Sequence, residues 1–288
     1  MSIKINDLRI YPIKSCGSIA LRSCKVSAEG LENDRRYMLV DETGEFISQR
    51  SEPQLTLIHL SMNQGSFTAH RPDGTSLDLP IDPLSGKEAL QTSITCAVWS
   101  DTVESRMHPE GSAWFSAFLN RPVRLVCQDK GHVRAVNAVG GKEGDRLSLA
   151  DGYPLLLASV SSLAALNERL SAKVSMSRFR ANVIVEGAAP FDEDLWSELN
   201  LGALPFSAPK LCDRCVVTTI NDSSGQKSKE PLATLATFRK WNRAVWFGSN
   251  LIPRSLGELK VGDLVHATKV RPHPRETAPP VNSSDELD

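Results

Sequence analysis

Two cysteines, Cys212 and Cys215, lie three residues apart in the stretch LCDRCVVTTI. A pair with this spacing can ligate a metal, cycle as a dithiol, or present one thiolate to another group. A structural zinc site needs four ligands, and the chain has no second CxxC, CxxH or HxxxH pattern. A thioredoxin-like dithiol needs its cysteine at the start of a helix, whereas VVTTI is rich in β-branched residues that favour a strand. Both chemistries are therefore disfavoured.

The predicted strand would also separate the two thiols. Side chains three residues apart in a strand point to opposite faces, so Cys212 and Cys215 cannot face one site unless the chain turns between them. One thiol would then be functional and the other a packing residue. If the pair stood alone, we would interpret both cysteines as small side chains of the core.

Polar residues in three other segments could form an anion site beside the thiolate. The segments are YPIKS with Lys14 and Ser15, NDRRY with Asp34, Arg35 and Arg36, and SRFRANVIV with Arg178, Arg180 and Asn182. In the last segment, spacing by two predicts that the polar residues share one face of a strand. A guanidinium binds phosphate through a planar fork, and an ammonium adds a point charge. Together these groups could hold a phosphorylated cofactor near a soft thiolate.

The composition excludes several classes of partner. The chain has 288 residues, and its 33 lysines and arginines nearly balance its 34 aspartates and glutamates. This balance argues against nucleic acid, and no apolar run approaches the roughly 20 residues of a membrane-spanning helix. The six cysteines are scattered, and the first residues lack the pattern of a secretory signal. We therefore expect a cytoplasmic protein without a membrane partner.

The turn signals and apolar patterns predict a mainly β chain with some helices, an α+β fold. Short strands continue to about residue 108, with a hairpin around DETG, and indicate a small barrel or sandwich. We predict three helices, one with Ser112 as N-cap, one with Ser159 or Ser161 as N-cap, and one over DEDLWSEL.

These elements suggest a division of the chain. We predict one domain over 1–108, a second β-rich domain over 109–268, and a Pro-rich disordered tail over 269–288. The cysteine pair lies in the second domain, whereas Lys14 and Arg35 lie in the first.

Several segments, taken in order, resemble a known family. They are YPIKSC, NDRRYMLVD, SEPQL, DGYPLLLAS, FRANVIVEG, FDEDLW, CDRCVVTTIN and FGSNLI, spread over roughly residues 3–268. Together they resemble the MOSC-domain proteins that carry a MOSC N-terminal β-barrel, and most of all the amidoxime-reducing components and bacterial N-hydroxylated-base reductases. The resemblance implies a small N-terminal β-barrel-like domain followed by a β-rich MOSC barrel domain.

The resemblance also implies a cofactor and its ligands. Members of this family bind molybdenum through a molybdopterin dithiolene and one cysteine, the second of a CxRC pattern, which is Cys215 here. Soft thiolate sulfur suits such a metal, and one protein thiolate suffices because the cofactor brings its own sulfurs. Cys215 is thus the expected metal ligand and catalytic residue. The expected cofactor-binding residues are Lys14, Ser15, Arg35, Ser159, Arg180, Asn182, Asp213 and Arg214.

The implied reaction is the reduction of N-hydroxylated compounds to amines or amidines. The chain lacks the C-x4-C-x2-C set of a plant-type [2Fe–2S] domain, so we expect no iron–sulfur cluster and a separate electron-transfer protein or flavin reductase. Two alternatives stay open. One is a sulfur-carrier or molybdenum-cofactor delivery module with a persulfide on Cys215, and the other is a β-rich structural protein whose CxxC only packs.

Overall fold

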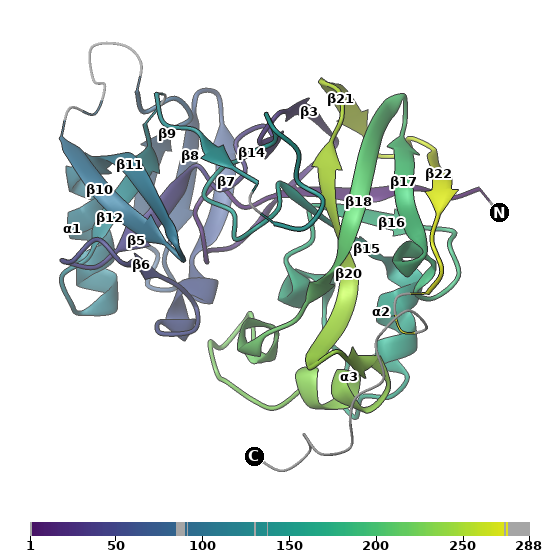
Figure 1. Ribbon diagram of the computed structural model, residues 1–288. Helices are drawn as coiled ribbons and strands as arrows, with labels where there is room; N and C mark the ends of the chain where they lie inside the picture. Colours follow the sequence, from purple (N-terminus) through teal and green to yellow (C-terminus); the bar gives the residue numbers. More distant parts are fainter. Residues whose placement is uncertain are drawn as a thin grey trace.

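The computed structural model describes residues 2–84, 90, 92–129, 131–136, 138–273 and 275. The described part is mainly β, with 22 strands and three α-helices, which confirms the predicted fold class. Its strands are arranged in two lobes that lie side by side (Figure 1). No α-helix among the described residues is both long enough and apolar enough to cross a membrane.

The first lobe is built on a five-stranded sheet with the order β10-β11-β12-β5-β6. Its strands are β5 (Tyr37–Val40), β6 (Phe46–Ile47), β10 (Ser93–Val98), β11 (Asp101–His108) and β12 (Arg124–Gln128). A second sheet pairs β7 (His59–Asn63), β8 (Ser66–His70) and β9 (Ser76–Pro80). The side chains of Tyr37, Phe67 and Phe115 are fully buried in the core of this lobe.

The hairpin predicted around DETG is confirmed. Strands β5 and β6 pair antiparallel, with Leu39 opposite Ile47. The carboxylate of Asp41 accepts hydrogen bonds from the backbone N–H groups of Thr43 and Glu45, at 2.8 and 3.1 Å. An aspartate that bonds the backbone two residues on is a common stabiliser of turns.

Helix α1 (Pro109–Leu119) begins four residues earlier than a cap at Ser112 would allow. The N-cap is His108, whose Nδ1 accepts from the Gly111 N–H at 3.0 Å, so the choice of Ser112 was wrong. The Ser112 hydroxyl instead bonds the His108 carbonyl and the Leu125 N–H. These bonds tie the helix to β12, and the first sheet therefore continues past the boundary that we predicted at 108/109.

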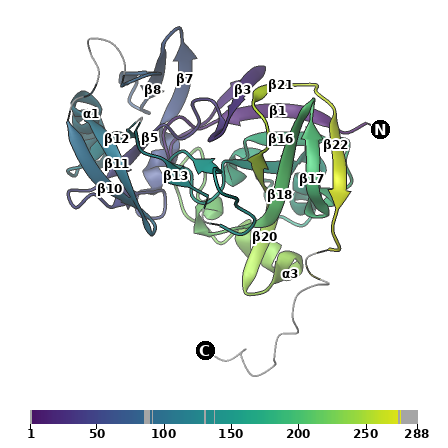
Figure 2. The same cartoon turned by 45° about the horizontal axis from the view of Figure 1, so that its top comes forward.

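The second lobe is built on a nine-stranded sheet with the order β2-β1-β16-β15-β20-β18-β17-β22 and with β19 paired to β20. The strands are β1 (Lys4–Ile10), β2 (Ile19–Leu21), β15 (Leu155–Ser159), β16 (Val183–Glu186), β17 (Trp196–Leu201), β18 (Leu204–Asp213), β19 (Lys240–Trp241), β20 (Ala244–Pro253) and β22 (Val265–Val270). The N-terminal strand β1 thus belongs to the second lobe, where it pairs antiparallel with β16 (Figure 2).

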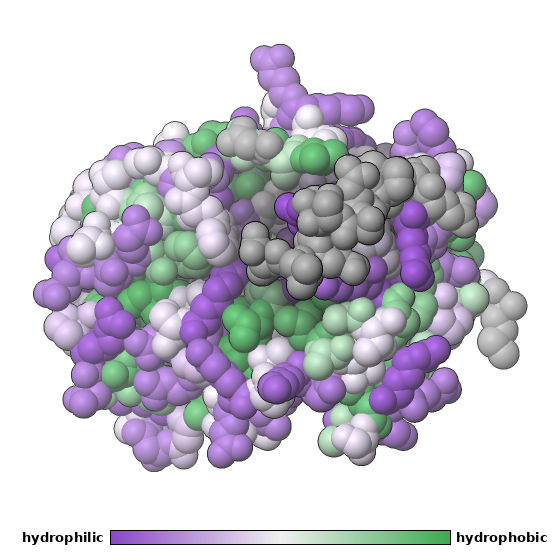
Figure 3. Space-filling view, turned by 60° about the horizontal axis from the view of Figure 1, so that its bottom comes forward, coloured by the Kyte–Doolittle hydropathy of each residue, from purple (hydrophilic) through white to green (hydrophobic). Residues whose placement is uncertain are grey.

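Smaller elements complete this lobe. They are β3 (Ser23–Ser27), β4 (Gly30–Leu31) and β21 (Gly257–Lys260) in one sheet, the pair β13 (Arg134–Ala135) and β14 (Arg146–Leu147), and helices α2 (Val160–Asn167) and α3 (Leu232–Arg239). Ser159, one of the two predicted candidates, is the N-cap of α2. On the face shown in Figure 3, hydrophobic side chains gather near the centre, with hydrophilic ones around them.

Two predictions for the last third of the chain differ from the structure. DEDLWSEL is a short 3-10 helix, Asp192–Asp194, followed by β17, so the predicted α-helix was wrong. The carboxylates of Glu193 and Asp194 are fully buried, and Asp194 pairs with Arg239. Strand β22 runs to Val270, within the predicted tail, and residues 276–288 lie outside the described part.

Candidate active site

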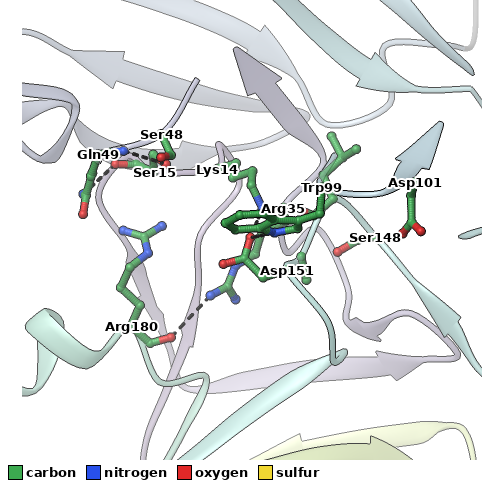
Figure 4. Close-up of polar contacts among 12 residues, drawn as sticks. Lys14, Ser15, Arg35, Ser48, Gln49, Trp99, Asp101, Ser148, Asp151 and Arg180 are labelled. Carbon is green, nitrogen blue, oxygen red and sulfur yellow. Dashed lines mark hydrogen bonds and ion pairs between the residues drawn. The ribbon is translucent and has the colours of Figure 1, made fainter. Parts of the chain in front are cut away.

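A cavity of about 460 Å³ lies between the two lobes, within the usual size range of small-molecule sites. The first lobe contributes Ser48, Gln49, Arg50 and Trp99 to its wall. The second lobe contributes residues 210 and 212–215, from the end of β18 and the turn that follows it. Figure 4 shows part of this wall, including Lys14, Arg35, Trp99 and Asp151, and Trp99 Nε1 lies 3.2 Å from Asp151 Oδ1.

Eight of the nine predicted site residues line this cavity. They are Lys14, Ser15, Arg35, Arg180, Asn182, Asp213, Arg214 and Cys215. Ser159 is not among the residues that line it. Its side chain is fully buried, and its hydroxyl accepts from the Ser162 N–H at 3.4 Å as the cap of α2. The structure therefore gives Ser159 a local structural contact in place of a position on the cavity wall.

Lys14 and Ser15 follow β1 and are fixed by buried polar contacts. Lys14 Nζ donates to the Leu149 carbonyl at 2.8 Å and pairs with the carboxylate of Asp151. Burial lowers the pKa of Lys14, and the Asp151 carboxylate opposes that shift. Ser15 has a left-handed backbone (φ 71°), which Gln49 holds through a bond from its Nε2 to the Ser15 carbonyl at 2.7 Å.

The Asp151 carboxylate is the counter-charge of Lys14. Its burial acts to raise its pKa, but the Lys14 ammonium and a hydrogen bond from Trp99 Nε1 at 3.2 Å hold that pKa below its usual range. Asp151 is therefore ionised at neutral pH and keeps Lys14 in place. The block DGYPLLLAS that contains it was part of the family resemblance, which was the available signal for this residue.

Arg35 and Arg180 lie over the ring of Tyr11, with 4.4 and 4.3 Å from each guanidinium carbon to the ring centroid. Arg35 donates to Asn182 Oδ1 at 3.0 Å, and Arg180 donates to the Cys16 carbonyl at 2.7 Å. Burial lowers the pKa of Arg180, and the nearby charge of Arg35 lowers it further. Arg35 is also paired with the buried carboxylate of Asp34, so the two guanidiniums on this ring leave a positive charge, mainly that of Arg180, to attract an anion.

The strand that we predicted through SRFRANVIV begins later than expected. Met176–Phe179 is a 3-10 helix, Arg180 is left-handed (φ 56°), and β16 starts at Val183. Arg178, Arg180 and Asn182 therefore do not share a strand face. Arg178 bonds the Thr218 carbonyl at 2.8 Å and does not line the cavity, whereas the other two do.

The cysteine pair spans the end of β18. The strand stops at Asp213, and Cys215 precedes a 3-10 helix, Val216–Thr219, so the strand predicted over VVTTI was wrong. The Thr218 hydroxyl bonds the Cys215 carbonyl at 3.0 Å, a local contact that stabilises the turn. Because the chain turns here, both thiols line the same cavity, contrary to the separation expected from strand geometry.

Each of the two thiols accepts a hydrogen bond from a different arginine. Arg214 Nη1 donates to Cys212 Sγ at 2.9 Å, and Arg50 Nη2 donates to Cys215 Sγ at 3.3 Å. Burial raises the pKa of Cys212, while the charge of Arg214 acts in the opposite direction. Both thiols are half-buried; Cys212 lies beside an arginine of its own lobe, and Cys215 faces a cation from the other lobe.

Arg50 and Trp99 are wall residues that the sequence analysis missed. The guanidinium of Arg50 lies 4.7 Å from the centroid of the Trp99 ring, in addition to its bond with Cys215. The signal for Arg50 was its place directly before SEPQL, one of the segments of the resemblance. Trp99 follows a predicted strand and carried no chemical pattern.

The charges of the cavity wall are strongly unbalanced. Six cations and two carboxylates line it, namely Lys14, Arg35, Arg50, Arg180, Lys210 and Arg214 against Asp151 and Asp213. Arg214 Nε is buried without a hydrogen-bond partner in the described structure. Because buried donors are normally paired, this atom and the cationic surplus fit an anionic, phosphorylated group bound next to a thiol. No cluster of three or more potential metal-ligating side chains occurs among the described residues.

The comparisons with known proteins agree with this arrangement. The family model of the MOSC N-terminal beta barrel domain matches residues 2–122, and that of the MOSC domain matches residues 144–266. The mitochondrial amidoxime reducing component 2 of Bos taurus is 31% identical over 280 residues, which are 91% of this chain and 82% of that protein. The mitochondrial amidoxime-reducing component 1 of Homo sapiens is 31% identical over 281 residues, with the same coverage.

A further relative has another activity in its name. The molybdenum cofactor sulfurase of Oryza sativa subsp. japonica is 30% identical over 269 residues, which are 85% of this chain and 32% of that protein. The relatives thus associate the chain with the molybdenum cofactor and, through the amidoxime-reducing components, with oxidoreductases. The chain belongs to the family of MOSC-domain proteins that carry a MOSC N-terminal beta barrel domain.

Proposed function

We propose that this protein is a molybdenum-cofactor-dependent oxidoreductase that reduces N-hydroxylated compounds, such as amidoximes and N-hydroxylated bases, to amidines or amines. One observation carries the proposal. Cys215, the second cysteine of the CxRC pattern, lies in the same cavity as six cations drawn from both lobes. A soft thiolate next to an anion site matches a cofactor that has a phosphate at one end and a metal at the other.

Different wall residues would bind different parts of such a cofactor. Lys14, Arg35, Arg180 and Arg214 would bind its phosphate and pterin oxygens, and the Cys215 thiolate would ligate the metal. Asn182 is a positioning residue, because its amide already bonds Arg35, the Leu156 N–H and the Arg9 carbonyl. When bound, the cofactor supplies the two-electron chemistry that removes the oxygen from the N-hydroxyl group.

Asp213 lies where its charge is compensated. Its carboxylate pairs with Lys210 Nζ at 3.2 Å, and its side chain is more than half exposed. The ion pair keeps this carboxylate toward the rim of the cavity, so it adds little repulsion toward an anionic cofactor. We propose that Asp213 and Arg214 contact the cofactor chiefly through their backbone and through the Arg214 guanidinium.

The electrons have to come from outside the chain in this proposal. We propose a separate electron-transfer protein or flavin reductase as the donor, because the sequence has no cysteine set for an iron–sulfur cluster. A cytoplasmic location stays a prediction. The word mitochondrial in the names of two relatives describes those proteins and is not transferred to this chain.

Metal analysis of purified protein tests the proposal. The wild type is expected to contain molybdenum and pterin in about equal amounts and to reduce an amidoxime with a chemical electron donor. Cys215→Ser should lose the metal and the activity, whereas the matched control Cys212→Ser should keep most of both. A normal molybdenum content in Cys215→Ser would show that the ligand assignment is wrong.

A sulfur-carrier function is the second candidate. It is favoured by the similarity to a molybdenum cofactor sulfurase and by the Arg50 guanidinium, which would also stabilise a persulfide anion on Cys215. Mass spectrometry of the intact protein separates the two candidates. One extra, reductant-labile sulfur atom on Cys215, together with the absence of amidoxime reduction, would favour the carrier.

A further inference from the structure

Trp99 occupies a position where a tryptophan is unusual. Strands β10 and β11 pair Val98 with Asp101, so Trp99 and Ser100 form a two-residue hairpin turn. The backbone of Trp99 is left-handed, with φ of 57°. Such turns strongly favour asparagine, aspartate and glycine, because a bulky side chain is strained there. Strained residues of this kind gather at ligand sites.

Three contacts hold the indole ring at the cavity. Its Nε1 donates to Asp151 at 3.2 Å, its ring meets Phe46 edge-on at 4.9 Å, and the Arg50 guanidinium lies over it. Despite these contacts, 49% of Trp99 is exposed, whereas Trp196 and Trp246 are 5% and 9% exposed. The ring is therefore fixed in place without being buried, unlike a tryptophan that serves the core.

Arg50 connects the indole ring to the thiol. The guanidinium that lies over the Trp99 ring also donates to Cys215 Sγ, so this one planar group contacts both the ring and the sulfur. Val216, the neighbour of Cys215, is 40% exposed, and Val139, the neighbour of the wall residue Ala138, is 70% exposed. Exposed apolar side chains thus flank a cavity whose interior is cationic. Figure 4 shows the ring beside Asp151, to which its Nε1 donates.

We infer that Trp99 is a platform for the flat body of the substrate, and that the site prefers N-hydroxylated compounds whose N-hydroxyl group is conjugated to a planar aromatic ring. This inference rests on the proposed function for the reacting group, but the platform itself is a binding site. Offset stacking on the indole would place the ring at the mouth and direct its substituent toward Cys215. The cationic wall favours neutral rings over positively charged ones.

Calorimetric binding of two unreactive probes to the full chain, purified as it is expressed, tests the platform. The probes are 2-naphthamide, which is flat, and its fully saturated analogue, which has the same heavy atoms but is not flat. Trp99→Asn removes the ring and suits the left-handed backbone, and Trp99→Phe keeps an aromatic face. We expect Trp99→Asn to weaken the binding of 2-naphthamide by about three- to tenfold, and Trp99→Phe to weaken it by less than about threefold. Binding of the saturated amide should change by less than about twofold in either variant.

The stability of the variants separates a platform from a structural residue. Asparagine relieves the left-handed turn but loses the three contacts of the indole, so Trp99→Asn should melt close to the temperature of the wild type. A loss of binding without a matching loss of stability is typical of functional sites. Equal losses for both probes, no loss for either, or a markedly lower melting temperature would overturn the inference. A ring-selective loss in a protein that reduces no amidoxime would keep the platform and refute the proposed function. If the protein reduces amidoximes and Trp99→Asn leaves KM unchanged for both aromatic and aliphatic amidoximes, the proposed function is kept and the platform is refuted.

Discussion

Arg50 Nη2 donates a hydrogen bond to Cys215 Sγ over 3.3 Å, although the two residues lie 165 positions apart and belong to different lobes. The backbone of Arg50 is also held from the second lobe, because Lys227 Nζ donates to its carbonyl at 2.8 Å. The environment of the thiol is therefore complete only when both lobes are in contact.

Replacement of Arg50 should impair the reaction more than it impairs folding. Arg50→Gln removes a charged donor from the sulfur, and hydrogen bonds to charged groups contribute about 1.5–3 kcal/mol, so kcat for amidoxime reduction should fall at least about tenfold. Metal content and steady-state kinetics would be measured on the same preparation. Arg36→Gln is the matched control, since Arg36 pairs with Glu29 away from the cavity wall and should keep near-normal kcat. Wild-type kinetics in Arg50→Gln would refute a role for this contact.

Asn182 should matter for stability as well as for the site. Its amide is almost fully buried and forms three hydrogen bonds, so Asn182→Ala leaves buried partners unpaired and should lower the free energy of unfolding by about 2–4 kcal/mol. Urea unfolding measures this change. Asn250→Ala is the comparison, because Asn250 also lines the cavity but donates one bond, to the Leu211 carbonyl, and should cost about 1 kcal/mol. Equal losses in the two variants would contradict the hydrogen-bond argument.

The buried ion pair between Arg239 and Asp194 predicts a large loss of stability. Arg239 Nη2 lies 2.5 Å from Asp194 Oδ2, and both side chains are almost fully buried. Arg239→Met leaves the buried carboxylate with the His273 ring, at 3.4 Å, in place of a permanent cation and should cost about 3–5 kcal/mol. The exposed pair Lys4–Glu186, at 3.2 Å, offers the contrast, and Lys4→Met should cost less than about 1 kcal/mol. A loss below 1 kcal/mol in Arg239→Met would show that Asp194 takes up a proton or another partner instead.

Glu193 predicts a pH dependence of stability in the mildly acidic range. Burial raises the pKa of its carboxyl to about 7 in the folded chain, compared with 4.5 for an ordinary glutamate, and only a hydrogen bond from Ser162 opposes the shift strongly. The folded state then binds the proton more tightly than the unfolded state, so stability is greatest below pH 4.5 and falls as the pH rises to about 7. The loss is on the order of 3 kcal/mol.

The measurement is urea unfolding between pH 5 and 8, with Glu193→Gln as the partner variant. The neutral amide cannot titrate, so the difference between the two proteins isolates Glu193 from the neighbouring Asp194, whose pKa burial also raises. The wild type should lose stability relative to the variant as the pH rises. A constant difference across this range would mean that Glu193 is ionised throughout.

Much of the fold was predictable from local patterns. The alternating runs and the DETG turn predicted the β5–β6 hairpin, and the polar start of α2 narrowed its cap to Ser159 or Ser161, of which Ser159 is the cap. The secondary-structure predictions fail where hydrogen bonds from side chains override the intrinsic backbone preference of the residues. VVTT has β-branched residues typical of strands, but the Thr218 and Thr219 hydroxyls bond carbonyls three residues back and hold a 3-10 turn.

The composition of the cavity wall was only partly predictable, for a related reason. Lys14, Arg35, Arg180 and Cys215 belong to motifs that the family resemblance marked, and the structure brings them to one cavity. Arg50 reaches the thiol only because the lobes pack in one particular way, and no spacing within a single segment encodes that approach. Trp99 depends on a strained turn that its sequence, VWSD, does not favour.

The pairing of β1 with β16 has a consequence for how the chain is made. The first strand to leave the ribosome pairs along one edge with the nearby β2, but the partner of its other edge, β16, comes about 175 residues later, and β20, which lies next to β15 in the same sheet, comes later still. During synthesis one edge of β1 therefore stays unpaired until most of the second lobe has emerged. The second lobe cannot be completed until its late strands are made, so slow translation or premature termination within it should produce an aggregation-prone fragment in place of a folded domain.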